Sequence, residues 1–162
     1  MESKATSQTS TPALCHDTGF NCIAASARVL DRALTRLYED PIRPLGLRAP
    51  QMTLLVVISR KPGITATQVA QYLVIDRSTL SRNLTRMAQN GWVREEESAA
   101  DARARPLYLT PAGQRLLTKA MPKWKQSQIK AKEMLGVEAA ERMVTLAREL
   151  MTMPGASESD SG

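Results

Sequence analysis

The sequence is poor in aromatic residues, histidine and cysteine, and each shortage excludes a kind of core or of chemistry. Aromatic residues make up 4% of the 162 residues, so a core has to be built from Leu, Ile, Val, Met and Ala. There is one histidine, no glycine-rich phosphate loop and no pair of carboxylates in a helical context. Because so little catalytic chemistry is present, the sequence predicts a protein that is not an enzyme and needs no cofactor.

Long hydrophobic runs and an export signal are also missing. No apolar run approaches the roughly 18 residues that span a bilayer, so no membrane partner is expected. Residues 1–16 are rich in Ser and Thr and lack the basic and apolar segments of a secretory signal. With two cysteines and no such signal, we expect a cytoplasmic protein without structural disulfides. Residues 1–16 and 153–162 are expected to be flexible tails.

What the sequence does contain is positive charge and helical periodicity. The net charge of +6 and the pI of about 9.7 favour an acidic partner such as nucleic acid. Apolar residues recur at helical spacing from Phe20 until Pro41 and Pro44, which are expected to end the helix. A second helix is predicted from Pro50 to Ile58.

Two short helices with a tight connection are predicted between residues 65 and 90. Thr65 and Gln68 form a capping-box pattern at the start of the first helix. Asp76 is a suitable N-cap for the second helix, and Gly91 lies where a C-terminal glycine belongs. The second helix places three apolar residues on one face (Leu80, Leu84, Met87) and hydroxyls and arginines on the other (Arg77, Ser78, Thr79, Ser81, Arg82, Arg86). This pattern indicates a helix-turn-helix whose second helix contacts DNA, although a solvated amphipathic helix has the same pattern.

The segment from Trp92 to Thr110 changes to a strand pattern. Trp92–Val93 and residues 106–109 predict two strands, joined by a charged loop that contains Asp101, Arg103 and Arg105. A charged hairpin directly after a helix-turn-helix is typical of a winged helix, whose tip reaches a minor groove. A surface cluster of ion pairs is the alternative interpretation of the same charges. Beyond the hairpin, a long helix is predicted from Pro111, with a kink at Pro122, and Gly136 separates it from a last helix.

These segments together resemble the MarR family. "DARARPLYLTPAG" is similar to the family's wing signature, an Asp-x-Arg pair followed by an apolar-x-Leu-Thr-x-x-Gly junction (here Asp101, Arg103, Leu107, Leu109, Thr110, Gly113). "VAQYLVIDRSTLSRNLTRMAQNGWV" looks like its helix-turn-helix. "LTRLYEDPIRPLGLRAPQMTLLVVI" resembles its first two helices and "PKWKQSQIKAKEMLG" its long dimerisation helix. The resemblance covers roughly residues 18–151.

The resemblance implies a mainly α fold with a small β-wing, in which a winged helix-turn-helix domain is joined to N- and C-terminal dimerisation helices. The expected divisions are a first dimerisation helix and linker at 17–48, the DNA-binding domain at 49–111 and the C-terminal dimerisation helices at 112–152. The implied activity is that of a homodimeric transcriptional repressor on a pseudo-palindromic operator in double-stranded DNA. A small effector, such as a phenolic compound, or cysteine oxidation is expected to release it.

The resemblance also assigns roles to residues. Arg103 is expected to enter the minor groove and Asp101 to position it, while Arg105 contacts phosphate. The full set of expected DNA contacts is Thr65, Thr67, Gln68, Arg77, Ser78, Thr79, Ser81, Arg82, Arg86, Asp101, Arg103 and Arg105. A ligand pocket is expected near Arg28, Arg32, Arg36 and Trp124. The acidic run Glu95–Glu97 departs from a DNA-facing pattern, and it either faces away from DNA or orders the wing arginines.

Cys15 and Cys22 are candidates for redox sensing, and three interpretations stay open. Cys22 is a buried small residue, an oxidant-sensing thiol in the first helix, or part of a metal site with Cys15 and His16. The spacing of these three residues is not a recognised zinc pattern, so no metal is expected. For the whole protein, a winged-helix module that binds protein instead of specific DNA is the alternative.

Overall fold

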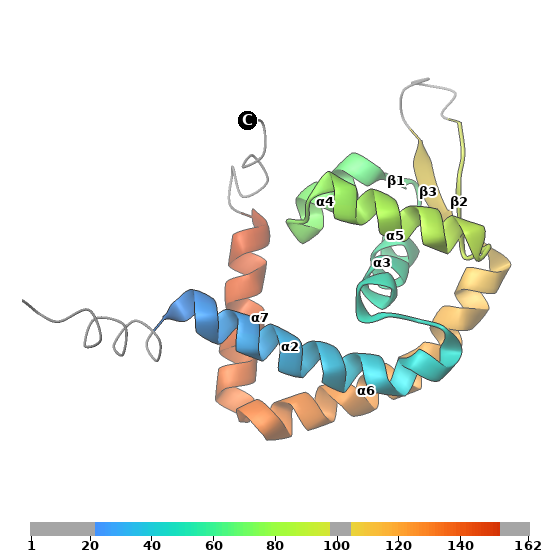
Figure 1. Ribbon diagram of the computed structural model, residues 1–162. Coiled ribbons are helices and arrows are strands. Elements are labelled where there is room, and N and C mark those ends of the chain that lie inside the picture. The colour runs from blue at the N-terminus through green and yellow to red at the C-terminus, as the bar shows by residue number, and fades with distance from the viewer. Residues whose placement is uncertain (1–21, 98–104, 153–162) are drawn as a thin grey trace, which may run out of the picture. The chain divides into compact units, whose positions relative to one another are not determined.

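The structure is a computed structural model that describes residues 22–97 and 105–152. Its elements in chain order are α2 (Ile23–Ile42), the 3-10 helix η1 (Arg43–Leu45), α3 (Ala49–Arg60), β1 (Ile64–Thr65), α4 (Ala66–Leu73), α5 (Arg77–Gln89), β2 (Val93–Glu95), β3 (Pro106–Leu109), α6 (Pro111–Leu135) and α7 (Val137–Thr152) (Figure 1). The expected fold class, mainly α with a small β-wing, is confirmed. None of the helices in these ranges is long and apolar enough to cross a membrane.

The chain divides into two compact units, residues 1–36 and residues 37–162. In the first unit, the described part is the N-terminal segment of α2 with Cys22 directly before it. All other elements belong to the second unit.

The first helix ends between Pro41 and Pro44, as the sequence predicts, although α2 includes Pro41 and ends at Ile42. A proline inside a helix leaves the carbonyl four residues earlier without its usual donor. Here that carbonyl belongs to Leu37, and it accepts a hydrogen bond of 3.1 Å from the buried Ser127 hydroxyl of α6. A serine from another helix thus replaces the missing N–H, and α2 ends one residue later with the turn Arg43–Leu45.

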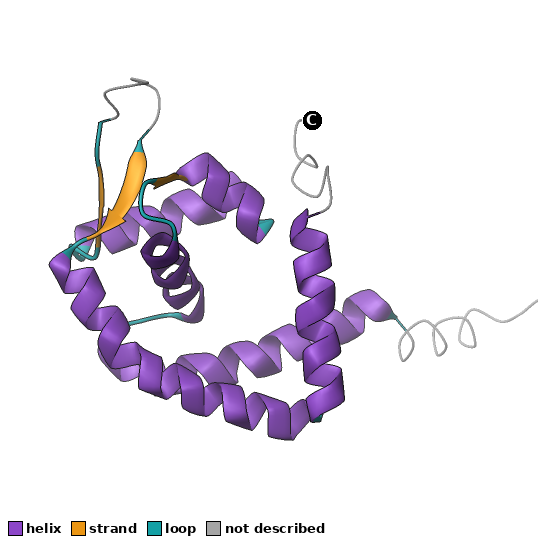
Figure 2. Ribbon diagram, turned by 180° about the vertical axis from the view of Figure 1, so that it is seen from behind, coloured by secondary structure: helices purple, strands orange, loops and turns teal. Residues whose placement is uncertain are grey.

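The sheet has three antiparallel strands in the order β1-β3-β2, one more than the sequence predicted (Figure 2). β3 pairs with both neighbours, so Leu107 lies opposite Ile64 on one side and Glu95 on the other. The first wing strand was placed at Trp92–Val93, whereas β2 is Val93–Glu95 and Trp92 lies in the preceding turn. The extra strand ties the hairpin to the end of α3 and the start of α4.

The core lies between α3, the two helices of the helix-turn-helix and the sheet. Leu55 of α3, Val69 of α4 and Met87 of α5 have no solvent exposure, and Leu107 of β3 is 1% exposed. The predicted inner face of α5 is confirmed, since Leu80, Leu84 and Met87 are all buried. Aliphatic residues and methionine build this core, as the shortage of aromatic residues requires.

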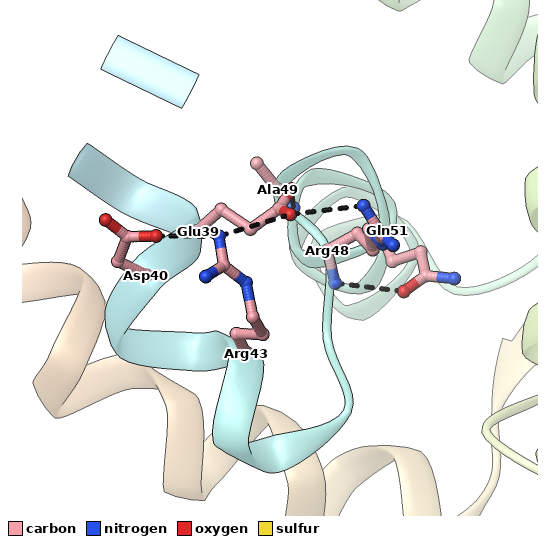
Figure 3. A network of polar contacts seen from close by, with 6 residues as sticks. All are labelled: Glu39, Asp40, Arg43, Arg48, Ala49 and Gln51. Carbon is pink, nitrogen blue, oxygen red and sulfur yellow. Dashed lines mark hydrogen bonds and ion pairs between the residues drawn. The ribbon is translucent and has the colours of Figure 1, made fainter. Parts of the chain in front are cut away.

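A buried carboxylate joins the end of α2 to the start of α3 (Figure 3). Glu39 accepts from the Ala49 backbone N–H at 3.3 Å and from the Arg48 guanidinium at 3.4 Å. Arg48 in turn donates its backbone N–H to the Gln51 side chain at 3.0 Å, which closes the first turn of α3. Because free N–H groups at a helix N-terminus favour a negative charge, Glu39 stabilises the start of α3.

Candidate nucleic-acid interface

The first helix of the helix-turn-helix begins with the predicted capping box. The Thr65 hydroxyl accepts from the Gln68 N–H at 3.3 Å, and the Gln68 side chain accepts from the Thr65 N–H at 2.9 Å. Both side chains are therefore engaged in holding the helix start. That they also contact DNA stays a prediction, as it does for Thr67, which is exposed in the first turn of α4.

The turn between α4 and α5 depends on one left-handed residue. Val74 has φ of 51°, and it is the one non-glycine residue with positive φ in the described part of the chain. Its N–H donates to Gln71, and the next N–H, of Ile75, donates to the Ala70 carbonyl at 3.1 Å. A β-branched residue in this conformation is strained by about 1–2 kcal/mol. This left-handed conformation reverses the chain tightly between the two helices.

The predicted N-cap of α5 is confirmed. Asp76 accepts from the Thr79 N–H at 2.6 Å and from the Ser78 hydroxyl at 2.7 Å. These hydrogen bonds, from the Ser78 side chain first and then from Thr79, lower the pKa of Asp76 to about 2. The carboxylate thus stays ionised at neutral pH and is occupied by the helix start.

The outer face of α5 presents cations and hydroxyls to solvent. Arg77, Ser78, Ser81, Arg82 and Arg86 are exposed, and Thr79 is half-buried. The Arg82 guanidinium lies along the helix, 3.3 Å from both the Ser78 carbonyl and the Thr79 hydroxyl. Thr85 is exposed on this face as well and was missed; its position four residues after Ser81 was the available signal.

The two strands at the base of the wing, β2 and β3 (the wing stem), carry a further arginine that was not predicted from the sequence. Arg94 on β2 lies opposite Tyr108 on β3, and its guanidinium carbon is 5.1 Å from the centre of the tyrosine ring. Glu96 forms an ion pair with the same arginine. One acid of the Glu95–Glu97 run therefore holds a stem arginine against an aromatic ring.

A hollow of about 630 Å³ lies between the recognition helix and the wing stem. Ser81, Thr85 and Ala88 of α5 form one wall, and Arg94 and Glu95 of β2 line the opposite side. The α5 wall also contains longer side chains (Arg77, Leu80, Leu84, Gln89).

The base of the wing is clamped to the start of α6. Thr110 donates its backbone N–H to the Trp92 carbonyl at 3.0 Å and its hydroxyl to the Gly91 carbonyl. The same hydroxyl accepts from the Gly113 N–H at 3.1 Å, so Thr110 is the N-cap of α6, with Pro111 in the first turn as expected. Gly113 is buried directly against Trp92.

The remaining predicted site residues fall in three groups. Asp101, Arg103 and Cys15 lie outside the described residues, together with His16, so their roles stay predictions. Arg105 is exposed directly before β3. Cys22 is half-buried and free.

The expected ligand-pocket residues belong to different units. Arg28 and Arg32, with Arg36, lie on α2 in residues 1–36, and Trp124 lies on α6. The Trp124 ring packs at 6.3 Å from that of Tyr38, whose pKa is raised by burial. Tyr38 also donates a hydrogen bond to Gln128, so the surroundings of Trp124 join the end of α2 to α6. A shared pocket with the arginines stays a prediction.

The fold and the site together define a winged helix-turn-helix protein: two helices with a tight turn, the second with a basic outer face, followed by an antiparallel hairpin. Comparison with known proteins agrees. The MarR family model matches residues 45–104. The transcriptional regulator HosA of Escherichia coli O157:H7 is 34% identical over 105 residues, which are 65% of this chain and 78% of HosA. The organic hydroperoxide resistance transcriptional regulator of Bacillus subtilis is 29% identical over 90 residues, 56% of this chain and 61% of that protein.

Solved structures show the same similarity. The Mycobacterium tuberculosis transcriptional regulator MosR, in complex with DNA, superposes with a TM-score of 0.69 at 32% identity, over 79% of this chain and 95% of that one. Escherichia coli MarR with operator DNA has a TM-score of 0.73 at 19% identity, over 83% and 96% of the two chains, and supports the fold. The chain belongs to the MarR family. It is thus a DNA-binding transcriptional regulator and not an enzyme.

Proposed function

We propose that the protein is a sequence-specific repressor that reads a pseudo-palindromic operator in double-stranded DNA as a homodimer. The observation that carries the proposal is the outer face of α5, where Arg77, Arg82 and Arg86 are exposed and the nearest acid, Asp76, is occupied by the helix cap. Arginine is the residue that most often contacts guanine in the major groove, and cations on such a helix meet phosphate without repulsion. Such a regulator acts where chromosomal DNA lies, in the cytoplasm.

The exposed apolar surface of the C-terminal helices supports a homodimer. Large apolar side chains between 37% and 59% exposed recur along the end of α6 and along α7 (Ile129, Met134, Val137, Met143, Val144, Leu146, Leu150, Met151). A helix face of this kind is usually covered by a partner. Because a two-fold axis repeats the recognition helix, a dimer requires two half-sites about one helical turn apart.

Two signals for release are proposed, a small ligand and cysteine oxidation. A relative is named for organic hydroperoxide resistance, and Cys22 is the free thiol in the described part of this chain. If oxidation is the signal, Cys22→Ser should abolish peroxide-dependent release from DNA while leaving DNA binding in the reduced state unchanged. Unchanged release in that variant would leave a ligand as the signal.

Selection from random duplexes, followed by fluorescence anisotropy, tests DNA reading directly. Wild type should enrich a palindrome, and Arg82→Gln should bind it about 10- to 100-fold more weakly, the loss expected of one bidentate base contact. Arg148→Gln on α7 removes the same charge away from the recognition helix and should bind normally. Arg103→Ala should also weaken binding by about tenfold or more through the minor groove. If no sequence is enriched, the winged helix is a protein-binding module instead.

A further inference from the structure

The helix with the largest net positive charge is α6 and not the recognition helix α5. This helix carries Arg115, five lysines (Lys119, Lys123, Lys125, Lys130, Lys132) and a single acid, Glu133. Its net charge is therefore +5, whereas the recognition helix α5 carries +3 and the chain as a whole +6, because acids elsewhere offset the remaining cations. The helix with the largest excess of positive charge is thus α6.

Four of these cations share one side of the helix. Arg115, Lys119 and Lys123 follow each other at four-residue spacing, and Lys130 is seven residues further along the same face. Arg115, Lys119 and Lys130 are exposed, and Lys123 is half-buried. Over 15 residues at 1.5 Å per residue, this α6 basic stripe is about 22 Å long.

The stripe is unfavourable for the isolated chain. Like charges four residues apart on a helix repel each other by a few tenths of a kcal/mol per pair. In the described ranges, the four stripe cations have no acidic side chain within ion-pair distance, whereas Lys132 on the other side of α6 meets Glu141 at 3.6 Å. A row of uncompensated cations is the complement of an anionic polymer.

The clamp at Thr110 fixes where the stripe begins. Arg115 lies just after the α6 turn that is bonded to Gly91 and Trp92, at the base of the wing. From there α6 leads away from the hairpin (Figure 1). Duplex DNA that passes the wing and bends toward the protein would meet Arg115 and Lys119 first and Lys130 last. At 3.4 Å per base pair, 22 Å corresponds to about six or seven base pairs.

We propose that the α6 basic stripe binds the phosphates of operator DNA that flanks the half-site read by α5 and the wing. This inference rests on the proposed function and extends it: α5 and the wing select the sequence, and the stripe adds sequence-independent affinity that depends on DNA length. The stripe therefore favours an operator in longer or bent DNA over the same operator in a short duplex.

A double variant with a matched control tests the stripe. Lys119→Gln with Lys123→Gln removes two stripe cations. Lys125→Gln with Lys132→Gln removes two cations on another side of the same helix. The affinity of both variants is measured by fluorescence anisotropy on two duplexes. One is the palindromic operator from the selection alone (about 20 base pairs), and the other is the same operator extended by about 20 base pairs on each side.

The stripe variant should bind the short duplex like wild type and lose affinity for the extended one. With a slope of about −0.9 per phosphate contact, two lost contacts per chain, or four per dimer, make the salt dependence shallower by about 3.6. Between 50 and 200 mM salt, wild type should thus lose about 100-fold more affinity than the variant on the extended duplex. The control variant should follow wild type on both duplexes.

Three other results would overturn the inference. Equal affinity of the stripe variant and wild type for the extended duplex, or an equal loss on both duplexes, removes the role of flanking DNA. If wild type sediments with phosphatidylserine vesicles and the stripe variant does not, while both bind the extended duplex equally, the stripe binds a lipid surface and not DNA. A lowered melting temperature of the stripe variant means that the lysines stabilise the fold. Failure of wild type to bind the short duplex refutes instead the proposed function itself.

Discussion

Replacing Gly113 by alanine tests whether the wing and α6 are joined as tightly as the structure indicates. Gly113 lies in the first turn of α6, and a Cβ placed on it would be 2.0 Å from the Trp92 carbonyl oxygen and 2.9 Å from the carbonyl carbon. Both are backbone atoms, so no side-chain rotation relieves the clash. A single methyl group must therefore push the start of α6 away from the turn before β2.

The expected cost follows from the contacts that this displacement breaks. To bring the Cβ to 3.0 Å or more from the oxygen, the two segments must separate by about 1 Å. That shift breaks the Thr110 hydrogen bonds to Trp92 and Gly91, each worth about 1 kcal/mol, or it is absorbed as overpacking that costs about 1–3 kcal/mol. We expect Gly113→Ala to lower the free energy of unfolding by about 2–3 kcal/mol.

Urea denaturation followed by circular dichroism measures this loss, and a second glycine supplies the control. Gly91→Ala introduces the same methyl group where no atom lies within 4 Å of the Cβ, although φ of 67° adds left-handed strain. That variant should lose about 1 kcal/mol. If Gly113→Ala loses no more than Gly91→Ala does, the close approach of α6 to Trp92 is not a constraint on the fold and the reasoning is refuted.

Two further predictions concern the helix starts. Asp76→Ala should destabilise the protein at neutral pH. Because the pKa of Asp76 is lowered to about 2, the difference in stability from wild type should persist above about pH 4 and vanish as the pH falls to about 2. Denaturation curves recorded across this pH range measure the difference, and a difference that does not change with pH would contradict the cap. Glu39→Ala should cost about 1–3 kcal/mol, since it removes the acceptor of the Ala49 N–H and of Arg48. The neighbouring Asp40→Ala, which removes only an exposed pair with Arg43, should change stability by less than about 1 kcal/mol, and equal losses in thermal melts would refute the distinction.

The features that were predicted from the sequence are those that local chemistry determines. Thr65, Asp76 and Thr110-Pro111 mark helix starts because short polar side chains cap free N–H groups and proline needs no donor in a first turn. Gly91 marks a helix end because it adopts φ of 67°. Each of these signals lies within four residues of the feature that it fixes.

The features that were missed depend on partners far away in the sequence. Pro41 lies inside α2 because Ser127, 90 residues away, satisfies the Leu37 carbonyl. The two-residue strand β1 has no pattern of its own and exists because β3 pairs with it. Val74 adopts a glycine-like conformation with no glycine to mark the turn. A local pattern cannot contain these contacts, which arise only when the chain is folded.

In the candidate site too, features set by local pattern could be predicted and features set by distant contacts could not. The exposed arginines of α5 could be predicted from periodicity, whereas Arg94 could not, because its position depends on the register that brings Tyr108 and Glu96 beside it. An arginine held by a ring and a carboxylate has lost much of its freedom before DNA arrives. The ring and the carboxylate therefore lower the side-chain entropy that is lost when this part of the wing contacts a phosphate.

The junction around Thr110 also determines how a signal would reach the DNA-binding elements. One side chain and its backbone N–H connect α6 to Gly91 and Trp92, which directly follow the recognition helix and precede β2. Because Gly113 leaves no free space at this contact, a shift of α6 by about 1 Å either moves the end of α5 and the base of the wing with it or breaks the Thr110 hydrogen bonds. A ligand or an oxidised thiol that repositions α6 would thus change major-groove and minor-groove reading together. A signal that acts through this junction needs no contact with the DNA-facing residues themselves.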